Sequence, residues 1–140
     1  MCIRDSGGWV RTGDIAIADA TGFVRIVDRI KELIITGGFN VYPTEVEDVL
    51  REMPEIADVA VVGVRTADGS GEEVVAAVVP ARGANVDPER VRAFARERLT
   101  GYKVPRRIDI VDELPRSLIG KVLRRRVRDR IEATEACDAD

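Results

Sequence analysis

The sequence has no histidine and very little cysteine. Histidine is absent from the 140 residues, and the two cysteines, Cys2 and Cys137, lie near opposite ends of the chain. A structural zinc site and a cysteine-histidine nucleophile are therefore excluded, because each needs side chains that the sequence lacks. The two thiols are expected to be reduced and incidental. Any proton transfer must use Lys, Asp, Glu, Tyr or solvent.

Long apolar runs are also missing. No stretch approaches the roughly 20 apolar residues that cross a bilayer. The N-terminus lacks the order of basic, apolar and small residues that is typical of a signal peptide. No transmembrane segment is expected, and the expected location is the cytoplasm, with peripheral attachment to a membrane left open.

Aromatic residues are scarce, at 4% of the chain. Their scarcity bears on residues 116–130, which carry seven basic residues against Asp129 alone. Basic segments that bind nucleic acid usually combine positive charge with aromatic side chains for stacking, whereas this chain has a net charge of -3. The arginines are interpreted as the solvated face of an amphipathic helix, and no nucleic-acid partner is expected.

The chain does contain enough apolar material for one core. Hydrophobic residues make up 45% of the sequence, and a chain of this length buries about 70% of its unfolded surface. Residues 8–29 alternate apolar and polar positions on both sides of "DATG", which predicts a β-hairpin. Residues 57–65 and 72–82 are apolar runs joined by a small polar loop, so they are expected to pair as antiparallel buried strands.

Helices are predicted on both sides of this strand pair. Thr44 and Glu47 have the spacing of a capping box, which predicts a helix that ends before Pro54. The remaining predicted elements are a helix from Asp87 and Pro88 that Gly101 ends, a strand over residues 106–114, and a helix over residues 121–133 with Val122, Leu123, Val127 and Ile131 as its apolar face. The fold class expected from this order is α+β, with two layers and a small antiparallel or mixed sheet.

Lysine is the rarest charged residue. Of 22 basic residues only Lys31, Lys103 and Lys121 are lysine. Lys121 ends the segment "LPRSLIGK", which is not a phosphate-binding P-loop because proline stands at position 115, where that motif needs glycine. The segment is interpreted as an extended, glycine-hinged loop that places an ammonium ahead of a helix. An ammonium is a compact charge that can bridge a carboxylate and a phosphate, which suits lysine better than arginine.

Two further segments carry candidate binding residues. In "RTGD", Asp14 follows a strand and could bind a pair of vicinal hydroxyls, although an ordinary turn has the same pattern. In "VDRIKELIITGGFN", Arg29 and Lys31 precede Gly37 and Gly38, and the glycines allow the backbone to approach a ligand closely. A strand bend with solvated charges explains this second segment equally well.

Taken together and in this order, "GWVRTGD", "VDRIKELIITGGFNVYPTEVE" and "GYKVPRRIDIVDELPRSLIGKVLRR" resemble the C-terminal part of the adenylate-forming superfamily. This superfamily contains acyl-CoA synthetases, luciferases and the adenylation domains of peptide synthetases. The resemblance covers residues 7–129. The sequence looks most like long-chain fatty-acid-CoA ligases, and coumarate-type or other acyl-CoA ligases stay open as an alternative. A noncatalytic, truncated lid that binds a partner is a second alternative.

The resemblance implies a domain organisation. Residues 1–6 form a start unrelated to the family, residues 7–29 are the hairpin that ends a large N-terminal adenylation domain, residues 30–132 form a C-terminal lid, and residues 133–140 form an acidic tail. The chain is therefore expected to be the tail of a longer enzyme, inactive alone, whose missing N-terminal domain is its partner.

The resemblance also implies roles for particular residues in a two-step reaction. A carboxylate attacks the α-phosphate of ATP to give an acyl-adenylate and pyrophosphate, and the thiol of coenzyme A then displaces AMP. Asp14 and Arg29 are implied to bind the ribose, and Lys121 to bridge the carboxylate and phosphate during adenylation. Lys31 is implied to be the hinge about which the lid turns, bringing Gly37, Gly38 and Phe39 to the pantetheine tunnel. Fatty acid, ATP and coenzyme A are the implied substrates; Mg²⁺ is expected with ATP, held mainly by the N-terminal domain, and no metal site is expected in this chain.

Overall fold

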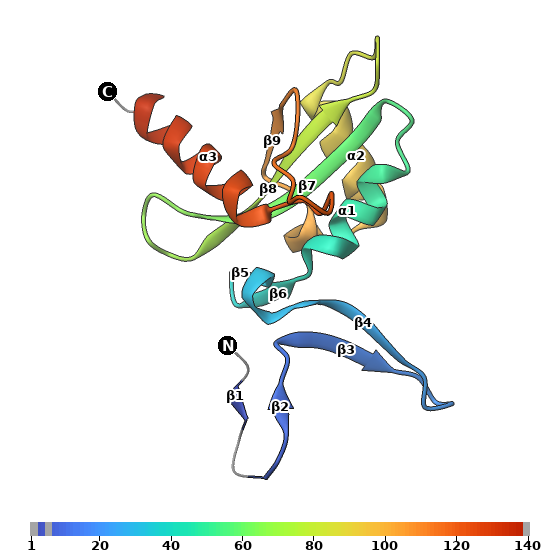
Figure 1. Ribbon diagram of the computed structural model, residues 1–140. Coiled ribbons are helices and arrows are strands. Elements are labelled where there is room, and N and C mark those ends of the chain that lie inside the picture. Colours follow the sequence, from blue (N-terminus) through green and yellow to red (C-terminus); the bar gives the residue numbers. More distant parts are fainter. Residues whose placement is uncertain (1–2, 5–6, 139–140) are drawn as a thin grey trace.

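The structure, a computed structural model, describes residues 3–4 and 7–138. It consists of a compact body and two hairpins that extend from it (Figure 1). The first pairs β1 (Ile3–Arg4) with β2 (Val10–Arg11), and the second pairs β3 (Asp14–Ala18) with β4 (Val24–Arg29), both antiparallel. The second confirms the predicted hairpin around "DATG". Of the expected unrelated start, residues 1–2 and 5–6 lie outside the described residues, as does Cys2.

The body follows the second hairpin. Its elements are a 3₁₀ turn (Ile30–Glu32), β5 (Ile34–Thr36), β6 (Phe39–Val41), α1 (Pro43–Arg51), β7 (Ile56–Arg65), β8 (Glu72–Pro80), α2 (Pro88–Arg98), a second 3₁₀ turn (Gly101–Lys103), β9 (Arg107–Ile110) and α3 (Arg124–Asp138). The strand order of the main sheet is β7-β8-β9, with β7 antiparallel and β9 parallel to β8. The predicted α+β class, the mixed sheet and the antiparallel strand pair are confirmed.

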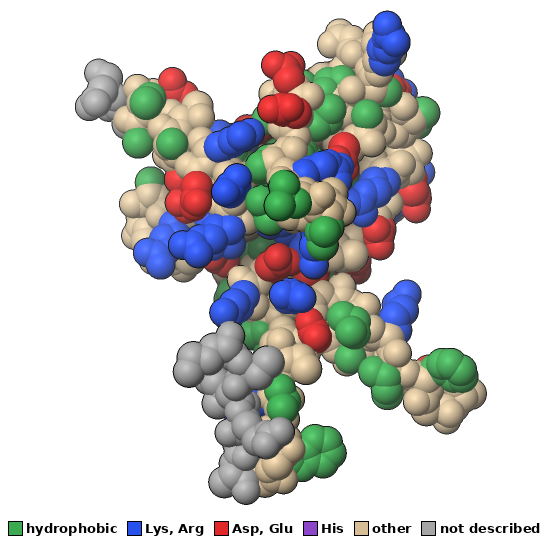
Figure 2. Space-filling view, in the orientation of Figure 1, with side chains coloured by type: hydrophobic (Ala, Val, Ile, Leu, Met, Phe, Trp, Pro, Cys, Tyr) green, Lys and Arg blue, Asp and Glu red, His purple; other side chains and the backbone are tan. Residues whose placement is uncertain are grey.

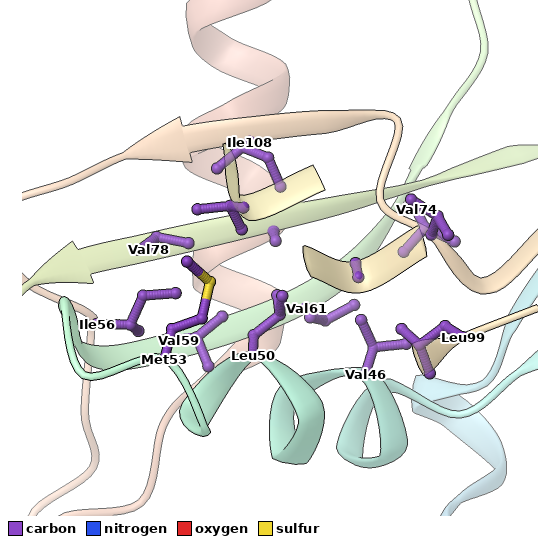
Figure 3. Close-up of a cluster of buried hydrophobic side chains, with 14 of the residues drawn as sticks. Val46, Leu50, Met53, Ile56, Val59, Val61, Val74, Val78, Leu99 and Ile108 are labelled. Carbon is purple, nitrogen blue, oxygen red and sulfur yellow. The ribbon is translucent and has the colours of Figure 1, made fainter. Parts of the chain in front are cut away.

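Both faces of the main sheet are covered, which explains why β7 and β8 are continuous apolar runs. Alternate residues of a strand point to opposite faces. Val59 and Val61 face α1 and α2 in the larger core. Ala60 and Val62 face the other way and belong to a second cluster, which includes Val127 of α3. In Figure 3, Val46 and Leu50 point from α1 toward the strands, as does Met53 just after the helix, and all three are buried. The helix α3 thus adds a layer on the second face.

The predicted capping box of α1 is wrong. The helix begins at Pro43, and its N-cap residue, Tyr42, makes no side-chain hydrogen bond to the first turn. Instead, the backbone N–H of Thr44 donates to Oδ2 of Asp28, in β4, at 3.0 Å. The carboxylate of Glu47 accepts a hydrogen bond from the backbone N–H of Val61 at 2.9 Å and therefore is turned toward the sheet.

The other helix boundaries agree in part with the sequence pattern. Asp87 caps α2 as predicted, since its Oδ1 accepts from the backbone N–H of Glu89 at 3.1 Å. The helix ends at Arg98 because Leu99 is extended, and Gly101 opens the 3₁₀ turn instead. The last helix begins at Arg124, three residues later than predicted, and continues to Asp138.

Residues 133–138, part of the expected acidic tail, are therefore helical. Glu135 forms an ion pair with Arg107, which joins this end of α3 to β9. Cys137 is free and exposed on the same helix.

Candidate functional site

Lys121 lies on a small, well-braced turn. The backbone N–H of Ser117 donates to the carbonyl of Lys121 at 2.8 Å, and that of Leu123 donates to Pro115 at 2.8 Å. Arg116 pairs with Asp58 of β7 and donates to the carbonyl of Gly120 at 2.7 Å. The prediction of an extended loop is therefore wrong, because the chain folds back on itself in a turn in which Gly120 has a φ of 81°. The turn holds Lys121 in a defined place, exposed, three residues before α3.

Asp14 and Arg29 come together at one end of the β3–β4 hairpin. They face each other in the strand register, and Nε of Arg29 lies 3.5 Å from Oδ1 of Asp14. The backbone N–H of Ile30 also donates to the carbonyl of Gly13 at 2.9 Å, which closes this end of the hairpin. The side chains of Arg29 and Asp14 are 60% and 25% exposed, so both groups remain accessible to a ligand.

Lys31 occupies the single turn that connects this hairpin to the body. The turn spans Ile30–Glu32, and Lys31 is exposed. Only three residues separate β4 from Leu33, so a change of backbone angles here would alter the direction of the whole hairpin. This position is suited to a hinge.

Gly37 and Gly38 form the two-residue loop of the β5–β6 hairpin. Their φ angles are 55° and 82°, a left-handed conformation that favours glycine and that two-residue hairpin loops require. Phe39 follows at once and stacks on Tyr102 with ring centroids 4.5 Å apart. Gly37, Phe39 and Tyr102 line a hollow of about 220 Å³ that has Val104 among its walls. The hairpin thus presents exposed backbone beside this hollow.

A partly buried ionic cluster, which sequence reasoning missed, lies between these segments. The Arg124 cluster consists of Arg124 with Asp28, Glu32, Thr44 and Glu47. Nε and Nη2 of Arg124 donate to the two oxygens of Glu47 at 2.9 and 2.8 Å, in the bidentate geometry of a strong pair. Arg124 also pairs with Glu32 and lies 3.8 Å from Oδ1 of Asp28. Burial lowers the pKa of Arg124, but Glu47, Glu32 and Asp28 outweigh it and raise that pKa above its ordinary value.

The cluster could have been suspected from one signal only. Glu47 stands beside Val46 on the face of α1 that carries Leu50, and a carboxylate on an apolar face needs a partner. Nothing in the sequence indicates that the partner is Arg124, 77 residues away.

The candidate residues do not form one complete site. Asp14 and Arg29 are joined, but within residues 3–4 and 7–138 no hydrogen bond or ion pair connects the ammonium of Lys121 to either of them. Gly37 and Phe39 belong to a separate hairpin. Over the same residues, no group of three or more His, Cys, Asp or Glu side chains could hold a metal ion, and no helix is both long and apolar enough to span a membrane.

The fold and these segments define a recognisable class of protein domain. Residues 45–121, a little over half of the chain, match the family of AMP-binding enzyme C-terminal domains. The chain belongs to this family.

Particular relatives extend the likeness to the hairpin. The chain is 49% identical over 122 residues to a long-chain-fatty-acid–CoA ligase of Escherichia coli, covering 87% of this chain and 21% of the ligase. It is 49% identical over 129 residues to a 2-succinylbenzoate–CoA ligase of Geobacillus kaustophilus, covering 92% and 26%. The crystal structure of ATP-bound MatB from Rhodopseudomonas palustris aligns with a TM-score of 0.84 at 40% identity, over 90% of this chain and 25% of MatB. The chain thus spans about a fifth to a quarter of these relatives.

Proposed function

We propose that this chain is the lid of an ATP-dependent acyl-CoA ligase acting on fatty acids. The observation that carries the proposal is the 49% identity to a long-chain-fatty-acid–CoA ligase over 87% of the chain, in a region that includes Lys121. The reaction joins a carboxylate to coenzyme A through an acyl-adenylate, with release of pyrophosphate and then AMP. An enzyme with these substrates is expected in the cytoplasm, free or peripheral to a membrane.

In this proposal Lys121 stabilises the adenylation transition state. The attack of a carboxylate on the α-phosphate brings two negatively charged groups together. An exposed ammonium on a braced turn can enter a site formed elsewhere and lie between them, since Lys121 has no ion pair with a described residue to give up. Removing one such electrostatic donor typically costs about 3 to 4 kcal/mol of transition-state stabilisation.

Asp14 and Arg29 are proposed to bind the ribose of the nucleotide. The Asp14 carboxylate can accept hydrogen bonds from two vicinal hydroxyls, and Arg29, 3.5 Å away, adds a donor. Because both lie before the turn at Lys31, they are proposed to stay with the N-terminal domain when the lid moves. Mg²⁺ is proposed to accompany ATP, bound mainly by that domain, and this chain is assigned no metal-binding step.

Rotation about Lys31 is proposed to follow adenylation. The rotation withdraws Lys121 and brings the Gly37–Gly38 loop to the acyl-adenylate, where Phe39 and the adjoining hollow line the path of the pantetheine arm. The left-handed backbone of the two glycines supports this role, because a loop without side chains lets a narrow ligand pass close to the main chain.

An aromatic-acid ligase is the second candidate. It is favoured by the equal identity, 49%, to a 2-succinylbenzoate–CoA ligase. The lid carries the shared adenylation and thioester chemistry, so the acid itself must be recognised by the N-terminal domain.

A chimera tests the proposal. Residues 7–138 replace the corresponding segment of the E. coli long-chain ligase, and formation of acyl-CoA from ATP, coenzyme A and oleate is measured. Activity that exceeds the ligase lacking its own lid by at least 100-fold supports the proposal. The same chimera built with Lys121→Ala is the matched control. A wild-type chimera that is folded and binds ATP but forms neither adenylate nor thioester would contradict the proposed function.

A further inference from the structure

The first helix of the body receives its cap from the hairpin. Thr44 is the second residue of α1, and its N–H is one of those that find no acceptor within a helix. The acceptor is Oδ2 of Asp28 at 3.0 Å, while Oδ1 of Asp28 accepts from the backbone N–H of Arg29 at 2.9 Å. Asp28 belongs to β4, on the other side of the turn Ile30–Glu32, and is only 6% exposed.

Elsewhere the hairpin meets the body across open space. A hollow of about 450 Å³ is lined on the hairpin side by Ile17 and Ile26 and on the body side by Tyr42 and Asp48, with a few neighbours. Ile17 and Ile26 remain 58% and 63% exposed, and Figure 2 shows the apolar side chains of the projecting hairpins uncovered. The orientation of the hairpin therefore depends strongly on the buried contact made by Asp28.

Arg124 connects this contact to the turn that carries Lys31. It pairs with Glu32, one residue after Lys31, and lies 3.8 Å from Asp28, three residues before Lys31. Its bidentate pair with Glu47 lies wholly within the body. A rotation at Lys31 would thus leave the Arg124–Glu47 pair intact, but it would separate Asp28 from both Thr44 and Arg124.

We infer that Asp28 is a positioning residue for the lid. Its hydrogen bond to Thr44 and its proximity to Arg124 hold the hairpin in the orientation seen here. Both contacts have to break before the lid can turn to its second orientation. The consequence for the two half-reactions rests on the proposed function, whereas the effect on the hairpin's orientation follows from the contacts alone.

Distance measurements on the chain itself test the inference. Cys2 and Cys137 are replaced by serine, and spin labels are attached at Ala20→Cys, in the turn of the hairpin, and Ala93→Cys, on the exposed side of α2. The labelled protein that keeps Asp28 is expected to give one narrow distribution of label distances. Asp28→Ala is expected to broaden it or to add a second peak. Asp28→Asn, whose amide oxygen can still accept from Thr44, is expected to fall between them.

Asp109→Ala is the matched control, because Asp109 lies on β9, pairs with Arg107 of the same strand and does not line the hollow between the hairpin and the body. Circular dichroism confirms that each variant is folded, and Asp28→Asn provides the test if Asp28→Ala does not fold. A narrow distribution in the folded Asp28 variants, identical to that of the control, would overturn the inference.

The two half-reactions of the chimera provide the functional readout. Asp28→Ala is expected to change the ratio of the adenylation rate to the thioester rate by about fivefold, the equilibrium equivalent of one lost helix cap. A purely structural role would lower both rates equally, and that result would count against the inference. If the wild-type chimera shows no activity, the proposed function fails, and the label distances still decide the role of Asp28.

Discussion

Glu47→Gln is expected to destabilise the protein more than the same substitution at an exposed glutamate of α1. Glu47 is 3% exposed, and its carboxylate accepts hydrogen bonds from Val61 and, through both oxygens, from Arg124. The glutamine oxygen can still accept from Val61, but the amide nitrogen cannot accept from the guanidinium. The substitution therefore removes the charge and one of the two parallel bonds from a buried pair.

The size of the effect follows from these contacts. Breaking a buried pair by removing one partner costs about 3 to 5 kcal/mol. Arg124 retains Glu32 and Asp28 and is not left without a counter-charge. We therefore expect Glu47→Gln to lower the free energy of unfolding by about 2 kcal/mol, near the cost of one lost hydrogen bond to a charged group. For a chain of this length that corresponds to a melting temperature lower by roughly 4 to 8 °C.

Glu45→Gln is the matched control for this measurement. Glu45 lies two residues away on α1 and pairs with Lys103 at 2.8 Å, but its side chain is 41% exposed. An exposed pair of this kind contributes about 0 to 1 kcal/mol. Urea unfolding followed by circular dichroism gives both free energies with their slopes. Equal losses in the two variants would refute the view that the Arg124 cluster acts as a buried, cooperative unit.

Further predictions concern Lys121, Lys103 and Asp68. In the chimera, Lys121→Ala is expected to slow adenylation by about 10² to 10³-fold and to leave thioester formation from supplied acyl-adenylate unchanged; equal loss in both steps contradicts the assigned role. The hydrogen bond to Glu45 raises the pKa of Lys103 above 10.5. The difference in the free energy of unfolding between wild type and Lys103→Gln should therefore reach its full size below pH 10.5 and vanish as the pH rises through the raised pKa. A difference that persists above that pKa would contradict the ion pair of Lys103 with Glu45 as its cause. The Ser70 hydroxyl and backbone N–H lower the pKa of Asp68 to about 2, which a chemical-shift titration measures. The small contribution of Asp68 to the free energy of unfolding is present above pH 3.8 and lost as the pH falls toward 2. An unshifted pKa in the wild-type protein would count against the hydrogen bonds between Asp68 and Ser70.

The parts of the fold predicted from the sequence are those that depend on local pattern. Alternation around "DATG", the apolar runs of β7 and β8, and the pair Asp87 and Pro88 each place their signal within a few residues. Local pattern failed where a distant group intervened. The spacing of Thr44 and Glu47 fits a capping box, but Asp28 supplies the cap and Arg124 takes the carboxylate. A pattern read along one segment cannot represent a competitor 16 or 77 residues away.

The arginines after Lys121 show the same limit. The helical spacing of Val127 and Ile131 identified two buried positions. Treating all of the arginines as a solvated face was wrong for Arg124, whose side chain is 17% exposed. The helix begins at this residue, so its side chain is directed by the preceding turn and not by the amphipathic pattern of α3. Only the tertiary structure reveals the difference.

The scarcity of lysine can now be related to partners. Lys103 is paired with Glu45, and the partly buried Arg124 is an arginine with a bidentate partner. Over the residues that the structure describes, Lys31 and Lys121 have no ion pair, and both are exposed. A planar guanidinium suits fixed pairs, whereas a compact ammonium on a braced turn keeps its three donors available for a charge that arrives later. The proposed chemistry requires that property at Lys121, because the negative charge it stabilises exists only while carboxylate and phosphate react.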